Sequence, residues 1–131
     1  MTYVLDSSIL FDLEKGENNI SDILVAKTGN EDTSSFYVTF INLFEFFLGL
    51  NARSPKNKAR SIDFVKKFQV LNSTEETAKL LAELKLKYEK KGIVLSLADL
   101  IIASLAIEND STVITSDTDF AKITELKKII I

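Results

Sequence analysis

The 131-residue sequence contains no cysteine and no histidine. Without cysteine there is no disulfide framework, zinc ribbon or thiol nucleophile, and without histidine there is no Ser-His-Asp triad and no imidazole base or metal ligand. Any hydrolytic chemistry must therefore come from carboxylates, hydroxyls, lysine or arginine, or from a hard metal ion held by oxygen. Sites built from carboxylates alone suit magnesium or manganese.

Proline occurs once and glycine four times, so no long linker is visible. The length and the 46% hydrophobic content predict one compact domain over residues 1–131. An apolar run begins almost at the first residue and no run approaches membrane-spanning length, so we expect a cytoplasmic protein with no signal peptide and no membrane association. The net charge of −3 gives no global attraction to nucleic acid.

Apolar runs that favour strands alternate with segments of helical spacing along the whole chain. This alternation predicts an α/β fold, in which a mainly parallel sheet is covered on both faces and the crossovers are right-handed. Strands are expected at 3–5, 36–40, 69–71, 112–115 and 128–131, and helices at 6–15, 19–27, 41–50, 54–68, 73–92 and 97–109, with a loop at 30–35 and a short helix after 117. Ser73-x-x-Glu76 is typical of a capping box at the start of the fifth helix.

Three acidic residues directly follow expected strands. Asp6 follows the first strand and precedes two serines, while Asp117 and Asp119 follow the strand at 112–115. Capping of a helix N-terminus is the ordinary explanation for an acid in such a place. In open α/β sheets, however, sites form outside the carboxyl ends of the strands, so the same acids are also candidates for a common site.

Glu45 and Asp99 stand out because their surroundings are apolar. Glu45 interrupts the most apolar segment of the chain, and a glutamate is almost never buried without a partner. It either lies on a narrow solvent-facing stripe, forms a salt bridge, or belongs to a site. Asp99 opens an apolar helix, where Ser96-x-x-Asp99 also fits a simple capping box.

These acids come from four separate segments, and clustered carboxylates repel one another and raise each other's pKa. Without a cation, such a cluster would destabilise the fold. A divalent metal bound by oxygen resolves this conflict, and it supports phosphodiester hydrolysis without histidine or cysteine.

The ordered set of acidic motifs resembles the PIN-domain family. The matching segments are Val-Leu-Asp6-Ser-Ser, Phe-Glu45-Phe-Phe-Leu-Gly, Leu-Ala-Asp99-Leu-Ile-Ile and Val-Ile-Thr-Ser-Asp117-Thr-Asp119-Phe. The resemblance implies a three-layer α/β/α sandwich and a Mg²⁺-dependent endoribonuclease, with Mn²⁺ as a substitute. A lone domain of this length is most similar to the toxin of a VapBC-type (type II) toxin–antitoxin pair, which inhibits translation.

The resemblance also implies roles for individual residues. Asp6, Asp99 and Asp117 would hold the metal, and Glu45 would complete the catalytic acids. Ser8, Thr115 and Asp119 would support them, and which of the two acids after the strand faces the metal stays open.

The resemblance further implies three partners: an RNA substrate that is single-stranded or looped, a cognate antitoxin, and a second copy of the chain in a homodimer. RNA must approach an acidic pocket, so its affinity should come from lysines on the rim, with candidates in the clusters at 56–67 and 85–91. A solvated helix face is the simpler explanation of those clusters. Large apolar side chains left exposed would form a groove for an antitoxin helix, and the candidates are Phe11, Phe44, Phe46, Phe47 and Leu50.

Two other functions remain open from the sequence. One is a phosphoryl-transfer domain that uses Asp6 as nucleophile, although the chain has Asp-Ser-Ser where haloacid-dehalogenase-type enzymes have Asp-x-Asp. The other is a PIN-like fold that acts only as a binding module. The filled acid positions argue against it, since a scaffold has no use for a repulsive cluster.

Overall fold

The computed structural model describes residues 1–30 and 32–131. The described elements, in chain order, are β1 (Tyr3–Leu5), α1 (Ser7–Lys15), α2 (Ile20–Thr28), the 3-10 turn η1 (Thr33–Ser35), β2 (Phe36–Thr39), α3 (Phe40–Leu50), α4 (Pro55–Val65), β3 (Gln69–Leu71), α5 (Glu75–Lys90), α6 (Leu97–Glu108), β4 (Thr112–Thr115), the 3-10 turn η2 (Thr118–Lys122) and β5 (Lys128–Ile130).

The strands form one sheet in the order β3-β2-β1-β4-β5, and all four pairings are parallel. From β1 the chain moves outward through β2 to β3, and it then returns to the other side of β1 for β4 and β5. The topological switch point therefore lies between β1 and β4, where Leu5 pairs with Ile114. Ligand sites of open α/β sheets form at the carboxyl ends of the strands at such a point.

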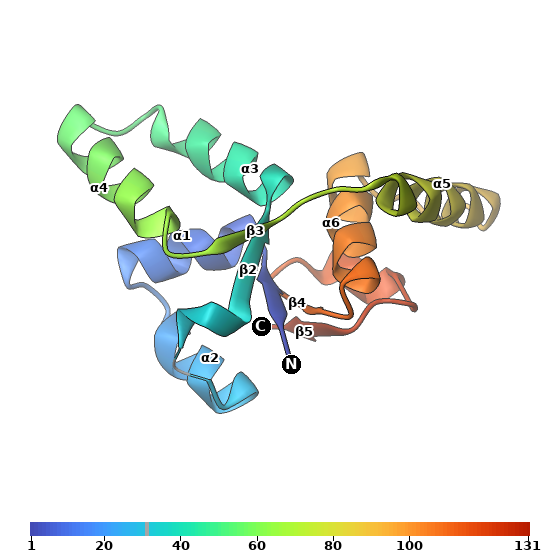
Figure 1. Ribbon diagram of the computed structural model, residues 1–131, viewed down its shortest axis with the longest axis horizontal. Helices are drawn as coiled ribbons and strands as arrows, with labels where there is room; N and C mark the ends of the chain where they lie inside the picture. Colours follow the sequence, from blue (N-terminus) through green and yellow to red (C-terminus); the bar gives the residue numbers. More distant parts are fainter. Residues whose placement is uncertain (31) are drawn as a thin grey trace.

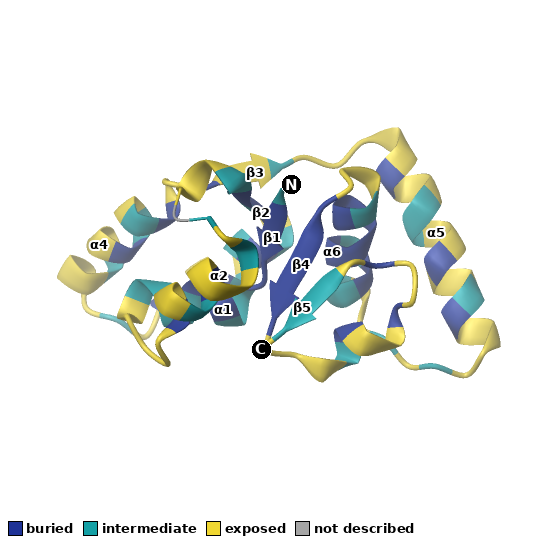
Figure 2. Ribbon diagram, turned by 90° about the horizontal axis from the view of Figure 1, so that it is seen from below, coloured by how far each residue is buried: buried dark blue, intermediate teal, exposed yellow. Residues whose placement is uncertain are grey.

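Helices cover both faces of the sheet, which confirms the predicted three-layer α/β/α sandwich. Helices α1 to α4 lie on one side of the strands, and α5 and α6 lie on the other (Figure 1). Alternate side chains of each strand enter the two cores, because successive residues of a strand point to opposite faces. Leu5 and Ile114 pack with α1 to α4, whereas Val4 and Val113 pack with α5 and α6. Figure 2 shows the central strands buried and the outer helix surfaces exposed.

The predicted elements are all present, and half of the strand and helix ends coincide with the prediction, while the others differ by one to three residues. The expected loop at 30–35 contains the turn η1, and its residue 31 lies outside the described residues. A capping box opens α5, but it begins one residue later than predicted and uses Thr74 and Thr77 in place of Ser73 and Glu76. The N-cap is Thr74, whose hydroxyl accepts from the Thr77 N–H. Both threonine hydroxyls also donate to Glu108 of α6, a tertiary contact that sets the helix start one residue later.

Among the helices of residues 1–30 and 32–131, none is long and apolar enough to cross a membrane.

Candidate metal centre

Asp6 directly follows β1, and its side chain connects this strand end to β4 at the switch point. Its side chain is buried, and both carboxylate oxygens accept hydrogen bonds. Oδ1 accepts from the Ser7 N–H at 2.9 Å and from Asn42 Nδ2 at 3.3 Å. Oδ2 accepts from the Thr115 hydroxyl at 2.6 Å. Asp6 thus caps α1, as the simple explanation held, and it also joins β1 to β4 and α3.

Two buried polar side chains hold Asp6 in place. Thr115, the last residue of β4, also accepts from the Asp117 N–H at 3.0 Å, so it orients the segment that carries the next acids. Asn42 is fixed by a capping box with Thr39 at the start of α3. Sequence reasoning missed Asn42, although a polar residue three positions after a strand-ending threonine is a recognisable capping signal.

Glu45 lies one turn further along α3 and belongs to this site. Its Oε1 accepts from the Ser7 hydroxyl at 3.4 Å. Burial raises the pKa of Glu45, and the neighbouring charge of Asp6 raises it further. For Asp6 itself, burial raises the pKa despite the hydrogen bonds from Thr115 and Ser7, and the charge of Asp117 acts in the same direction.

Asp99, Asp117 and Asp119 form the open part of the site. Each offers a carboxylate oxygen, and these oxygens all lie within 4.8 Å of one another. Asp99 is in the first turn of α6, where the Ser96 hydroxyl accepts from its N–H. Asp117 caps the turn η2 and accepts from the Asp119 N–H. Three convergent carboxylates are a ligand set suited to a hard divalent cation.

Asp99 shows the strongest effect of this crowding. Burial raises its pKa to about 6, with further contributions from the charges of Asp117, Asp6 and Asp119. The acids of β1, β4 and α6 therefore act on one another electrostatically. Both Asp117 and Asp119 contribute a carboxylate oxygen to the cluster.

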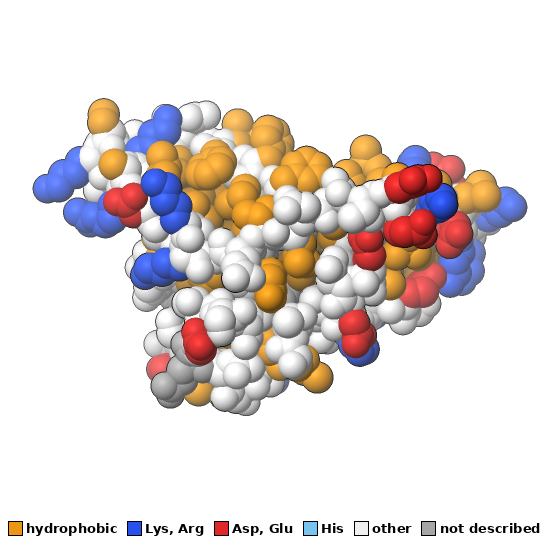
Figure 3. Space-filling view, in the orientation of Figure 1, with side chains coloured by type: hydrophobic (Ala, Val, Ile, Leu, Met, Phe, Trp, Pro, Cys, Tyr) orange, Lys and Arg blue, Asp and Glu red, His pale blue; other side chains and the backbone are white. Residues whose placement is uncertain are grey.

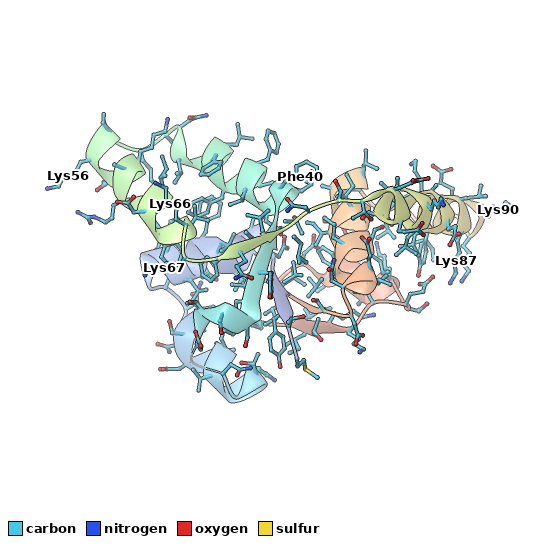
Figure 4. The ribbon with its side chains drawn as sticks, viewed as in Figure 1. Phe40, Lys56, Lys66, Lys67, Lys87 and Lys90 are labelled. Atoms are coloured by element: carbon cyan, nitrogen blue, oxygen red, sulfur yellow. The ribbon has the colours of Figure 1, made fainter. Side chains whose placement is uncertain are left out.

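Among the residues that the structure describes, the acids of this site form a single ion pair with a cation. The Lys122 ammonium pairs with Asp119 at 2.9 Å. The lysine clusters expected on the rim lie instead at the two ends of the molecule (Figure 3). Lys56 of α4 and Lys90 of α5 mark opposite ends of the molecule (Figure 4). Part of the charge of the clusters is also neutralised, since Lys87 pairs with Glu125 and Lys85 with Glu89.

Thr115 and Ser8 were both predicted to support the metal ligands, but their surroundings in the structure differ. Thr115 contacts Asp6 directly. The hydroxyl that reaches Glu45 belongs to Ser7 rather than Ser8. The Ser8 hydroxyl is buried without a hydrogen-bond partner among the residues that the structure describes, and Ser8 lines a neighbouring cleft.

The fold and the site define an α/β protein with a carboxylate-built candidate cation site at its switch point. The family model of the PIN domain matches residues 3–126, and the chain therefore belongs to the PIN-domain family. This membership confirms the family resemblance of the acidic motifs. No curated protein matches the chain.

Solved structures share the fold. One is VapBC2 from Rickettsia felis, solved in complex with a DNA fragment from the VapBC2 promoter. It is similar with a TM-score of 0.82 and 23% sequence identity, and the match covers 100% of this chain and 99% of that chain. VapBC-1 from nontypeable Haemophilus influenzae is similar with a TM-score of 0.81 and 24% sequence identity, and the match covers 99% of this chain and 98% of that chain. VapBC-5 from Mycobacterium tuberculosis is a member of the VapBC family of toxin–antitoxin systems. It is similar with a TM-score of 0.74 and 21% sequence identity, and the match covers 99% of this chain and 98% of that chain.

Replacing Asp99 by asparagine should stabilise the metal-free protein at neutral pH. The folded-state pKa of about 6 exceeds the ordinary aspartate value of 3.8, so ionising Asp99 costs more in the folded than in the unfolded state. This cost grows as the pH rises from the lower to the higher value and is then constant. Because Asp99 is only half-buried, we discount the full shift and expect Asp99→Asn to raise the free energy of unfolding by about 1 kcal/mol near pH 7.

Urea denaturation in EDTA at several pH values measures this effect. The gain should vanish at about pH 3, below both pKa values, where Asp99 is largely protonated in both states. The matched control is Asp63→Asn on α4, because Asp63 is exposed and pairs only weakly with Lys66. A gain for Asp99→Asn that does not depend on pH would contradict the electrostatic explanation.

Proposed function

We propose that this chain, acting as one domain over residues 1–131, is a metal-dependent endoribonuclease and the toxin of a type II toxin–antitoxin pair that inhibits translation in the cytoplasm. The observation that carries the proposal is the convergence of acids from β1, α3, α6 and the β4 end. Three carboxylates converge at the switch point of a PIN-family fold, and Asp6 and Glu45 lie beside them. Among the residues that the structure describes, only Lys122 forms an ion pair with any of these five acids.

The donor set fits a divalent cation. Asp99, Asp117 and Asp119 would hold Mg²⁺ or Mn²⁺, since their oxygens converge and hard cations prefer oxygen ligands. Asp6 borders this cluster, and its charge contributes to the raised pKa of Asp99. A bound divalent cation lowers the pKa of water and offsets charge on the non-bridging phosphate oxygens.

The remaining residues position these groups and handle protons. Thr115 and Asn42 fix the orientation of Asp6 by hydrogen bonds to its two oxygens. Glu45 has a raised pKa and lies beside Asp6, so its carboxylate can accept the proton of the water that attacks phosphorus. The ribose oxygen that leaves takes up a proton in its turn.

Single-stranded or looped RNA fits this site better than a duplex. The acids lie at the carboxyl ends of the strands, between the helices that cover the two faces of the sheet. A splayed strand can bring its phosphate to such a site, whereas a regular duplex exposes its phosphates on a broad convex surface.

An antitoxin is proposed as the first protein partner, in line with the similar VapBC structures. An apolar cleft of about 200 Å³ lies between α1, α2 and α4, and it is concave as helix-in-groove binding requires. Its apolar lining comes from Leu13, Leu24, Phe36, Phe64 and Phe68. A bound antitoxin should abolish RNA cleavage by the purified chain.

A second copy of the chain is proposed as the other protein partner. Phe46 and Leu50 of α3 are fully buried, but Phe40, Phe44 and Phe47 are exposed and form a stripe along the same helix. Figure 4 shows Phe40 at the start of α3. An exposed aromatic stripe suits a symmetric contact between two copies of the chain, because a two-fold interface is formed by the same surface patch of both subunits.

Sedimentation equilibrium of the purified chain tests the dimer. We expect a mass of twice 14.7 kDa. Phe44→Glu places a charge in the stripe and should give the single-chain mass. A single-chain mass for the wild type would contradict the homodimer.

Cleavage of labelled single-stranded RNA tests the nuclease. Wild type should cut the RNA in Mg²⁺ or Mn²⁺ and not in EDTA, and Asp6→Asn should lower the rate at least about a hundredfold. The matched control Asp63→Asn should retain full activity, and denaturation curves of all three proteins check the fold.

The other outcomes point to the two rival functions. Phosphate that labels Asp6 covalently would indicate a phosphoryl-transfer domain, although the three hydrogen bonds to its carboxylate disfavour Asp6 as a nucleophile. Equal cutting by wild type and Asp6→Asn would contradict the assigned site. A wild type that binds RNA but does not cut it, with or without metal, would indicate a binding module.

A further inference from the structure

A second cleft opens beside the acidic site. Its volume is about 790 Å³, within the range of about 300 to 1,000 Å³ that small-ligand sites occupy. Ser8 and Ser116 line its inner end, and they lie within two residues of Asp6 and Asp117. From there the cleft follows α1 and the C-terminal half of α3. It therefore continues outward from the candidate metal centre.

The cleft combines an apolar floor with polar walls. The partly exposed Phe11 supplies apolar surface, and the almost fully buried Ile9 and Ile20 also line the cleft. Phe11 stacks on Phe46 of α3 with ring centroids 4.9 Å apart, which fixes the floor to the core. A surface with both an apolar floor and hydrogen-bonding walls matches the two parts of a nucleotide, the base and the sugar-phosphate.

Two cations lie at the outer end of this cleft. The Lys15 ammonium and the Arg53 guanidinium lie over the Phe11 ring, at 5.7 Å and 5.9 Å from its centroid. Arg53 is bound to Glu14 in an ion pair, so its charge is largely compensated. Lys15 forms no ion pair with any residue of 1–30 or 32–131. Lys15 is thus available to an anionic ligand.

Lys15 is separated from the acids by the length of α1. Lys15 follows Asp6 by nine residues, which is about 14 Å along a helix axis. A phosphate bound there is not the one beside the acids but one further along the same strand. Asp12 lines the cleft one turn before Lys15, and its carboxylate can accept a hydrogen bond from a ribose 2′-hydroxyl.

We infer that this cleft, lined by Ser8, Phe11, Lys15 and Ser116, binds a nucleotide that flanks the scissile phosphate, with Lys15 contacting its backbone phosphate. The inference rests on the proposed nuclease function, because it assigns the path of the same substrate. It also assigns the substrate contact to a residue outside the two lysine clusters of α4 and α5. RNA would enter between α1 and the ends of β4 and β5.

The first test removes the charge of Lys15. Binding of fluorescein-labelled random-sequence single-stranded RNA is measured by anisotropy in Mg²⁺ at several salt concentrations, in the Asp6→Asn background so that the RNA stays intact. Lys15→Gln should weaken binding about threefold to tenfold and lower the slope of log K against log salt by about 0.7, because one phosphate contact is lost. The matched control Lys27→Gln, at the exposed end of α2, should change neither quantity.

The second test fills the cleft without touching the charges. Ala52 is exposed and lines the cleft, so Ala52→Trp should block the RNA and weaken binding at least about tenfold. Ala59→Trp, at an exposed position of α4 outside the cleft, is its control. Thermal unfolding of each variant verifies the fold.

The outcomes separate this inference from the nuclease proposal. Unchanged affinity and salt slope in both Lys15→Gln and Ala52→Trp, with a wild type that cleaves RNA, would overturn the cleft and leave the nuclease intact. The same result is expected if the cleft holds a protein segment instead. A wild type that does not cleave, combined with the predicted losses in binding, would support the cleft and contradict the nuclease.

Discussion

Electrostatic repulsion among partly buried carboxylates is the constraint around which the acidic edge of this protein is built. Asp6 and Glu45 are held in the protein by hydrogen bonds, while Asp99, Asp117 and Asp119 converge within 4.8 Å. Burial and neighbouring charge both oppose ionisation, as the raised pKa values of Asp6, Glu45 and Asp99 show. A fold that needed only stability would replace such a cluster with neutral residues.

The sheet order explains why these acids meet. The chain leaves β1 in one direction and returns on the other side, so the carboxyl ends of β1 and β4 become neighbours although 109 positions separate Asp6 from Thr115. The hydroxyl of Thr115 bridges this junction, since it donates to Asp6 and accepts from the Asp117 N–H. Helix α3 adds Asn42 and Glu45 from the β2 side. A few hydrogen bonds thereby set the positions of acids from distant segments.

Much of the fold followed from the sequence because it depends on local patterns. The alternation of apolar runs and helical spacing predicted the parallel three-layer architecture, and the isolated Glu45 in an apolar helix pointed to the site. Other features depended on tertiary contacts that no local pattern carries. The start of α5 is set by Glu108 of another helix, and only the packed structure distinguishes the buried Phe46 from the exposed Phe44.

The cations were the least predictable part for the same reason. The sequence offered the lysines at 56–67 and 85–91 as candidates, yet Lys56 and Lys90 lie at opposite ends of the molecule (Figure 4). Lys15 is not part of a cluster, and the role proposed for it depends on its position over Phe11 and beside Arg53 in the folded protein. Proximity in space, rather than density along the chain, decides which charge a substrate meets.

Calorimetric titration of Mn²⁺ into wild type and Asp99→Asn tests the central claim most directly, namely that the acidic cluster is a cation site. The account predicts binding to wild type that strengthens between about pH 5 and pH 8, as Asp99 loses its proton, and at least about tenfold weaker binding to Asp99→Asn. The exposed control Asp63→Asn should bind as the wild type does. Absence of binding to the wild type, or equal affinity in wild type and Asp99→Asn, would contradict it.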